Sequence, residues 1–558
     1  MIKNIAKDRV VIWIILALLI CSTGGIYDFN MAFYGVIISL VLVFVVKRRG
    51  QMEVEKNTST LAMLLILAGY IISALTAADK GIAFLGVIRI AVLCLCFLLW
   101  NNFGKESREK IWKGMTDAIS MITLLSMIGY FIPYSREILF HAGRFGGVLQ
   151  YSNTYACLLL LTLIVLIFQR QGKWTVVAYI QAAVLCMGII WCGSRSVFVL
   201  FVLSLIALLI HFFKKIRWKM FGIIAAIVVA GLIISLFISG LNVFRLFQLT
   251  LSSSTLNGRI LYWRDAGEQL LRRPQGLGYM GYYFLQPQFQ TGNYVTKYVH
   301  NDILQFGLDG GWLAMAGILL LFVRNIFCKN NSGRNRFVLV VLFLHVLFDF
   351  DLQYGFIFCV LLMCTSTGNG KKLVIKAVPG YGVSLAGLVV SAYFSIALGC
   401  SFYGNQDVAL AMYPANTFAL ETQMIDEDDT DAADQIIKQN GMLASAYEYH
   451  TMELIQNGDY EAADASVENM LKCAGYQSDY YDLAVYEWSY CLKQLVEDND
   501  LVQAQKFLDK IQGMPQRIED KEKQATVFAL RINDKPKIEL SEQVTEYIEK
   551  LQQVNLEN

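Results

Sequence analysis

Residues 258–312 read GRILYWRDAGEQLLRRPQGLGYMGYYFLQPQFQTGNYVTKYVHNDILQFGLDGGW. Five of these residues are arginine or lysine, and His300 stands just before the apolar segment that follows. Apolar segments flank the stretch on both sides, so we predict a loop between two membrane spans. A large cationic loop beside one histidine, in a mostly lipid-soluble chain, indicates a site for an anionic substrate at a membrane surface.

The flanking segments predict an all-α, polytopic membrane helix bundle. The chain has 558 residues, 56% of them hydrophobic, and a mean hydropathy of +0.47. Apolar runs long enough to cross about 30 Å of hydrocarbon recur along the first 400 positions. We predict about 13 spans, at 10–26, 30–46, 60–77, 82–100, 112–132, 152–168, 174–192, 197–213, 220–239, 303–323, 337–350, 352–367 and 378–401. The first of them is expected to be a retained anchor rather than a cleaved signal.

Basic residues predict the orientation of the bundle in the cell membrane. With a cytoplasmic N-terminus, the clear basic clusters in short loops all fall on the cytoplasmic side. These clusters lie at 47–49, 105–110, 170–173, 214–219, 324–336 and 371–372. The large loop, bounded at about 240–302, then lies outside, together with the segments around Arg144 and Arg195. An odd number of spans also places the C-terminal part outside.

The C-terminal part is predicted to be a separate domain, 402–558, after a membrane domain at 1–401. From residue 401 onward the chain has 30 acidic and 12 basic residues, a net charge of −18. This excess argues against binding to nucleic acid or to an anionic bilayer. Segments 457–472 and 498–511 each place a turn before an amphipathic helix, and they resemble tetratricopeptide helix pairs. An unrelated helical bundle is the alternative, and Cys473 and Cys491 are placed where they can pair.

His300 is a candidate proton acceptor at the boundary between the loop and the next span. Asn301 or Asp302 is expected to cap the helix that starts there. A neutral imidazole can take a proton from a sugar hydroxyl near neutral pH. A histidine with a purely capping or interfacial role is the alternative that these residues leave open.

Two of the candidate anion-binding arginines come from short outer segments. Arg144 lies in the glycine-rich run GRFGGVLQYSN before a span, and Asn153 enters the following helix, where a polar side chain is expected to face the bundle interior. Arg195 occupies a very short turn between two spans. Each guanidinium can clamp a phosphate in a bidentate fork or serve only as an interfacial anchor.

Two further candidates, Arg259 and Arg264, bracket Trp263 in the loop. If this segment is helical, Arg259 and Trp263 share one face. Either arginine can instead form an internal ion pair with the acidic residues that follow, and the pattern does not choose between the two.

A polar cluster near the end of a later span contains His345, Asp349 and Asp351. In a continuous helix His345 and Asp349 share one face, and we interpret them as a polar brace rather than as a metal site. The chain has no Walker loop, HExxH, GxSxG or dinucleotide fingerprint. Nucleotide use and zinc hydrolysis therefore have no support from motifs.

Four segments, in this order, resemble the O-antigen ligase and polymerase family of bacterial envelope glycosyltransferases. They are GRFGG with SNTYA at 143–156, GSRS at 193–196, NGRxxxWxxA at 257–266 with the glycine-rich run after it, and HNDxLQxGxxGG at 300–311. The resemblance covers about residues 60–370 and implies transfer of a glycan from an undecaprenyl diphosphate carrier, at the outer face, to an acceptor hydroxyl. It implies no cofactor and no metal.

The resemblance also assigns roles to residues. It implies that His300 is the base and that Arg144, Arg195 and either Arg259 or Arg264 bind the diphosphate. The supporting residues are expected to be Asn153, Asn301, His345 and Asp349.

Several functions remain open within and beyond this family. Polymerisation of repeat units in surface polysaccharide biosynthesis is preferred slightly over ligation of finished chains, and a protein O-oligosaccharyltransferase is a close variant. A transporter is disfavoured because the candidate arginines gather on the outer face and no inverted repeat is evident. The C-terminal helices are expected to bind envelope-assembly proteins, since helical repeats usually bind partners.

Overall fold

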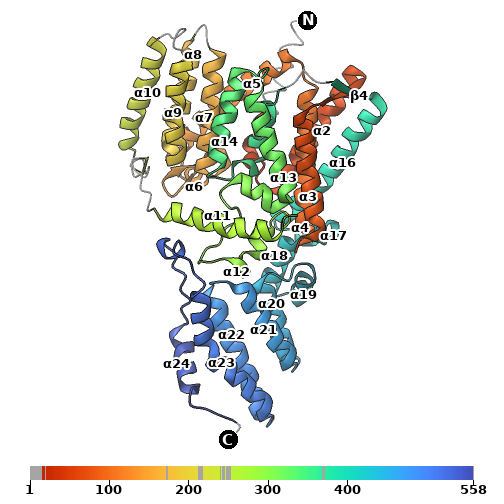
Figure 1. The fold of residues 1–558 in the computed structure, drawn as a ribbon, viewed down its shortest axis with the longest axis vertical. Helices are drawn as coiled ribbons and strands as arrows, with labels where there is room; N and C mark the ends of the chain where they lie inside the picture. Colours follow the sequence, from red (N-terminus) through yellow and green to blue (C-terminus); the bar gives the residue numbers. More distant parts are fainter. Residues whose placement is uncertain are drawn as a thin grey trace.

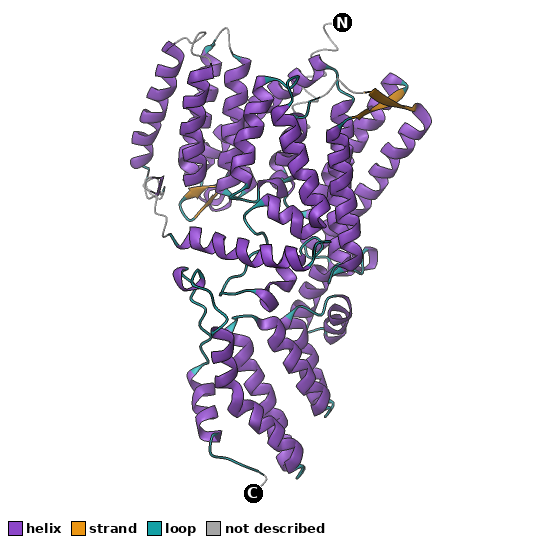
Figure 2. Ribbon diagram, in the orientation of Figure 1, coloured by secondary structure: helices purple, strands orange, loops and turns teal. Residues whose placement is uncertain are grey.

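The computed structural model describes residues 16–18, 20–170, 174–211, 218–238, 241, 245–246, 253–366 and 371–556. Helices make up most of this part of the chain, in a bundle at one end and a C-terminal tail at the other (Figures 1 and 2). Residues 10–15 and 19 of the predicted span at 10–26 lie outside the described residues.

Seven described helices are long and apolar enough to cross a membrane. They are α2 (Asp28–Arg49), α3 (Thr58–Thr76), α4 (Lys80–Asn101), α5 (Lys105–Ile128, continued by the short helix η2, Gly129–Phe131), α7 (Ser152–Gln169), α13 (Asp302–Phe327) and α16 (Ala377–Phe402). Shorter apolar helices are α8 (Val176–Cys192), α9 (Arg195–His211) and α10 (Trp218–Leu236). A helix of 22 residues such as α2 is about 33 Å long, enough to span the hydrocarbon core. The chain is a polytopic helical membrane protein.

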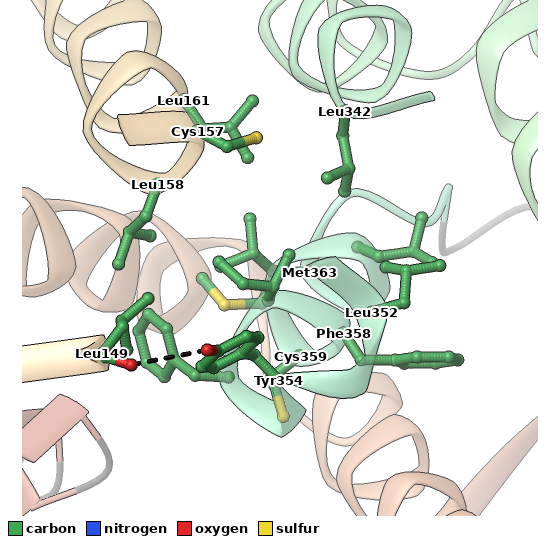
Figure 3. Packing of buried hydrophobic residues seen from close by; sticks show 14 of the residues in the cluster. Leu149, Cys157, Leu158, Leu161, Leu342, Leu352, Tyr354, Phe358, Cys359 and Met363 are labelled. Carbon is green, nitrogen blue, oxygen red and sulfur yellow. Dashed lines mark hydrogen bonds between the residues drawn. The ribbon is translucent and has the colours of Figure 1, made fainter. Parts of the chain in front are cut away.

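The two predicted spans at 337–350 and 352–367 form shorter helices. They are α14 (Gly333–Val346) and α15 (Gly355–Met363), with the short helix η6 (Asp351–Gln353) between them. At 1.5 Å per residue their lengths are about 21 and 14 Å. All nine residues of α15 are buried, and neighbouring side chains such as Leu158 and Leu342 surround them (Figure 3). Other helices therefore enclose α15, whereas α14 has an exposed face that includes Val340 and Leu344.

A two-stranded sheet closes the end of the bundle that lies away from the tail. Strand β1 (Gln51–Lys56) pairs antiparallel with β4 (Lys371–Lys376). This pairing puts the end of α2 beside the start of α16, and the two helices pack along their lengths. We call the opposite end, where the chain enters the tail, the tail-side face.

The 240–302 loop is largely helical where it is described. Helix α11 (Ser254–Arg272) lies across the tail-side face, and α12 (Gly281–Phe289) follows it (Figure 1). Leu261, Asp265 and Leu270 lie on the buried face of α11. Asp265 accepts hydrogen bonds from the Thr291 backbone N, at 2.9 Å, and from the Tyr294 hydroxyl, at 2.7 Å. These bonds fasten the returning segment of the loop to α11.

The tail consists of helices of different lengths. They are α17 (Gln406–Met412), α18 (Thr417–Glu427), α19 (Thr430–Gln439), α20 (Ala444–Gln456), α21 (Tyr460–Ala474), α22 (Ser478–Glu497), α23 (Leu501–Glu522) and α24 (Glu542–Leu551). Consecutive helices such as α20 and α21 or α22 and α23 pack together. Ala463 on α21 and Ala504 on α23 are fully buried, as the amphipathic pattern predicts. The tetratricopeptide resemblance stays a prediction. Cys473 and Cys491 are separate buried thiols.

The tail packs against the loop. Ala529 and Ile532 share an apolar cluster with Leu261 of α11, and the Thr526 backbone N donates to the Thr291 carbonyl at 3.0 Å. The tail therefore touches the helix that carries Arg259.

Candidate functional site

A buried carboxylate, Asp349, is the centre of a polar cluster at the tail-side end of the bundle. Its Oδ1 accepts from the Tyr151 hydroxyl at 3.0 Å and lies 3.2 Å from His300 Nδ1. Its Oδ2 accepts from Asn153 Nδ2 at 2.7 Å and from an Arg259 guanidinium nitrogen at 3.1 Å. A buried charge is tolerated when it is paired and hydrogen-bonded, and both oxygens of Asp349 meet this condition.

His300 is held by its backbone as well as by its ring. The next helix begins at Asp302, and the Asn301 side chain caps it by accepting from the Leu304 backbone N at 3.1 Å, as predicted. The Trp263 indole N donates to the His300 carbonyl at 3.2 Å. His300 has a φ of +53°, in the left-handed region that non-glycine residues seldom adopt. Such a conformation persists where its surroundings impose it, often at functional sites.

The other ring nitrogen of His300 is open. The side chain is 21% exposed, and its ring meets the Phe350 ring edge-on, with 4.9 Å between ring centroids. Across the described part of the chain, no protein group makes a hydrogen bond to His300 Nε2. With Nδ1–H donated to Asp349, Nε2 carries the lone pair and can accept a proton.

Arg144 joins this cluster through Asn153. It lies on the short strand β3 (Arg144–Phe145), which pairs with β2 (Phe140–His141). Its guanidinium donates to Asn153 Oδ1 at 2.6 Å and to the Cys192 carbonyl at 3.0 Å. Asn153 faces the bundle interior, as predicted, and links Arg144 to Asp349.

A fourth guanidinium, Arg245, was not predicted. Burial lowers its pKa from the ordinary arginine value, and the positive charges of Arg144, Arg195 and Arg259 lower it further. These four cations therefore share one region, although they come from separate segments of the chain. Arg245 belongs to no motif, and the one sequence signal is that it is the only charged residue from 220 to 258.

Of the two arginines that bracket Trp263, only Arg259 enters the cluster. The Arg259 side chain is 14% exposed, whereas Arg264 is an exposed residue. Five residues along a helix turn the side chain by about 140°, so the two guanidiniums leave α11 in different directions.

The prediction that His345 and Asp349 share one face of a continuous helix is wrong. Helix α14 ends at Val346, so the two residues do not share a helical face. His345 Nδ1 instead lies 2.5 Å from Asp351 Oδ2, and its Nε2 lies 3.2 Å from the Ser196 hydroxyl. His345 therefore ties α14 to Asp351 and to the start of α9.

The buried side chains of Cys157, His345 and Asp351 place one possible metal ligand each within 4.8 Å of one another. His345 and Asp351 already bond to each other, and Asp351 also accepts from the Thr154 hydroxyl at 2.7 Å. These hydrogen bonds account for the group as a polar brace.

Hydrogen bonds from α4 and α13 hold the segment that carries Asp349. Asp302, at the start of α13, accepts from the Leu352 backbone N at 2.8 Å and from the Gln353 side chain at 3.2 Å. Arg89 of α4 donates to the Gln353 carbonyl at 2.7 Å. Sequence reasoning treated Asp302 only as a possible cap and did not single out Tyr151. The structure shows both in contact with the segment between α14 and α15.

The fold and this cluster define a polytopic membrane protein with cationic side chains and an accessible imidazole at one face. Residues 180–319 match the O-antigen ligase family. The match runs from α8 into α13 and includes Arg195, Arg245, Arg259 and His300. This part of the chain is an O-antigen ligase domain, and membership in that family implies glycan transfer from a lipid-linked donor in surface polysaccharide biosynthesis. The chain shows no significant similarity to a curated protein or to a solved structure.

Proposed function

We propose that the protein transfers a glycan from an undecaprenyl diphosphate carrier to an acceptor hydroxyl at the outer face of the cell membrane. In this proposal the membrane domain is residues 1–401, the tail is residues 402–558, and both the tail-side face and the tail lie outside the cytoplasm. One observation carries the proposal. His300 and Arg259 meet on the two oxygens of a single buried carboxylate, Asp349.

His300 acts as the base in this scheme. The acceptor O–H bond breaks and its proton passes to His300 Nε2, while the acceptor oxygen bonds to the anomeric carbon of the donor glycan. The bond between that carbon and the diphosphate oxygen breaks, and its electron pair leaves on the diphosphate. Asp349 fixes the ring orientation and stabilises the imidazolium that forms.

The guanidinium cluster stabilises the leaving group. Negative charge grows on the diphosphate as the bond breaks, and donors already in place interact with it strongly where water is scarce. Arg144, Arg195 and Arg259 are the proposed diphosphate ligands, and Arg245 joins them because it lies near all three. Removal of one such donor typically costs about 10²- to 10³-fold in rate.

We prefer a polymerase to a ligase or a protein O-oligosaccharyltransferase, because no signature of a particular acceptor is visible in the sequence. A strain that lacks the chain distinguishes the two main cases. Single repeat units left on the lipid carrier indicate a polymerase, whereas full-length chains left on the carrier indicate a ligase.

The direct test of the base is His300→Ala, expressed in that strain. We expect the variant to insert normally but to restore no surface glycan. His450→Ala, which alters a partly exposed histidine of the tail, is the matched control and should restore it fully. Normal glycan length and amount with His300→Ala would show that the transfer does not use this base.

A further inference from the structure

A cavity lies beside the Asp349 cluster and differs from the cluster in chemical character. It is a cavity of about 640 Å³ between the start of α2, the segment before α7, the returning part of the loop, the end of α16 and the start of α18. Sites for small ligands usually measure roughly 300–1,000 Å³. None of the four clustered arginines lines this cavity.

The walls of the cavity are rich in aromatic rings. Eight of its lining residues are phenylalanine or tyrosine, and Gln150, Ser401 and Asn416 add uncharged polar groups. The Tyr354 hydroxyl donates to the Leu149 carbonyl at 3.4 Å, which holds that ring in the wall (Figure 3). Aromatic faces with a few hydrogen-bonding groups suit a sugar, whose C–H faces stack on rings while its hydroxyls bond to polar side chains.

Asp28 and Lys297, the acidic and the basic residue of the cavity wall, both contact other protein groups, while Lys297 and the lining residue His141 remain exposed. Asp28 forms an ion pair with Arg89 at 2.8 Å and accepts from the Tyr279 hydroxyl at 3.0 Å. Lys297 lies over the Phe418 ring, 5.3 Å from its centroid. The cavity therefore suits an uncharged, polyhydroxylated ligand better than a diphosphate.

Two residues, Asp349 and Phe350, each contact both His300 and residues of the cavity wall. Tyr151 lines the cavity and donates to Asp349 Oδ1, the oxygen that faces His300 Nδ1. Tyr151 and Tyr298 both stack on the Phe350 ring, with 4.7 and 4.9 Å between ring centroids, and the His300 ring meets the same Phe350. One layer of side chains thus connects the aromatic cavity to the proposed base.

The rim of the cavity carries exposed aromatic residues at the tail-side ends of α2 and α16. Tyr27 is 40% exposed and Phe402 is 51% exposed, and their ring centroids lie 5.1 Å apart. Aromatic residues gather at membrane–water interfaces. We therefore expect the rim to lie at the level where a lipid carrier displays its head group.

We propose that this cavity binds a sugar unit of the acceptor saccharide, next to the unit whose hydroxyl loses its proton to His300. The inference rests on the proposed function and deepens it, since the donor diphosphate binds at the arginines and the acceptor sugar binds among the aromatic rings. The acceptor can be a glycan on a lipid carrier or a glycan free of lipid, and both present the same sugar.

The test uses purified full-length protein and glycan from the strain that lacks the chain. One probe is the intact lipid-linked glycan, and the other is the same glycan released from the lipid by mild acid. The rim variant Tyr27→Ala/Phe402→Ala is compared with Phe131→Ala/Tyr134→Ala, which removes two exposed aromatic residues that do not line the cavity. Calorimetry measures binding of the released glycan, and a transfer assay measures the KM for the acceptor.

We expect the rim variant to weaken glycan binding and to raise the acceptor KM about tenfold, as the loss of two stacking rings predicts. Binding of inorganic pyrophosphate, which probes the arginine cluster, should stay unchanged. The control variant should match the wild type. If the rim variant is impaired only with the lipid-linked glycan, the result supports a lipid-borne acceptor. If it is impaired with both probes, the result supports an acceptor that is free of lipid.

Wild-type affinity and KM in the rim variant, for both probes, would overturn the inference. A second pair of variants separates this failure from failure of the proposed function. If His300→Ala and Arg259→Ala abolish transfer while the rim variant behaves as wild type, the cavity proposal is wrong and the proposed function stands. If transfer does not depend on His300 but glycan binding depends on the rim, the proposed function is wrong and the cavity is a sugar site.

Discussion

His300 Nδ1 lies 3.2 Å from Asp349 Oδ1, and this contact joins the loop to the segment between α14 and α15. The two residues are separated by the whole of α13 and α14. His300 precedes the N-terminus of α13, and its contact with a buried carboxylate fixes the orientation of its ring. In the proposed function Asp349 is a positioning residue, and we expect its loss to act through His300.

Asp349→Asn should lower transfer by about 10²- to 10⁴-fold, because an amide cannot accept from His300 and Arg259 together or stabilise an imidazolium as a carboxylate does. The rate of transfer at saturating donor is the measurement, and its pH profile should change as well. Asp407→Asn, at an exposed position on α17, is the control for the same chemical change. A variant with an unchanged pH profile and rate would show that Asp349 does not act through the imidazole.

Arg259→Ala and Arg264→Ala form a matched pair on one helix. Arg259 contacts Asp349, whereas Arg264 is exposed. We expect Arg259→Ala to lose about 10²- to 10³-fold in transfer rate, and Arg264→Ala to stay within about twofold, as exposed substitutions usually do. Equal losses in the two variants would mean that charge in the loop matters and position does not.

The apolar pattern predicted the helices of the bundle well because each long apolar run has to form a helix in a membrane. At 337–367 it predicted two helices with a break at 351, whereas the first helix ends earlier, at Val346, because apolar composition does not record where a helix breaks. The break after Val346 is stabilised by distant groups, since Asp302 and Arg89 hold the backbone and side chain of residues 352–353. A continuous helix therefore placed His345 and Asp349 on one face, whereas His345 bonds to Asp351.

The sequence predicted which types of residue form the site, but not which of these residues contact one another. Motif order pointed to His300 and to the outer arginines, yet the choice between Arg259 and Arg264 depends on which face of α11 meets the bundle. Arg245 and Tyr151 join the cluster only because the fold brings them near it. No motif or spacing in the sequence indicates that proximity.

Ile532→Asp tests whether the tail supports the site. Ile532 is 7% exposed and packs with Leu261 of α11, the helix that carries Arg259. A buried charge there should loosen the tail from α11, and we expect transfer to fall several-fold while the protein remains in the membrane. Leu530→Asp, at a neighbouring position that is 58% exposed, should have little effect. Full activity in Ile532→Asp, with the tail shown by protease digestion to be detached, would mean that α11 holds its position without the tail.

Glu487→Gln should make the tail more stable at high pH. Glu487 on α22 is 6% exposed, and within the described residues neither side-chain oxygen has a hydrogen-bond partner. Burial, with Glu448 nearby, raises the pKa of Glu487 to about 8, whereas an unfolded glutamate titrates near 4.3. Between these values the folded tail holds a proton that the unfolded chain releases. Stability therefore falls as the pH rises through this window.

Glutamine cannot ionise, so the variant should escape that loss. Hydrogen exchange in peptides of α22 measures it, with variant and wild type compared at the same pH so that intrinsic exchange rates cancel. At pH 8 we expect exchange to be roughly tenfold slower or more in Glu487→Gln, since one pKa unit corresponds to a factor of ten. The difference should shrink toward pH 5. Glu461→Gln, at an exposed position on α21, should show no such pH dependence. Equal exchange at pH 8 in Glu487→Gln and wild type would mean that Glu487 ionises without cost to the fold.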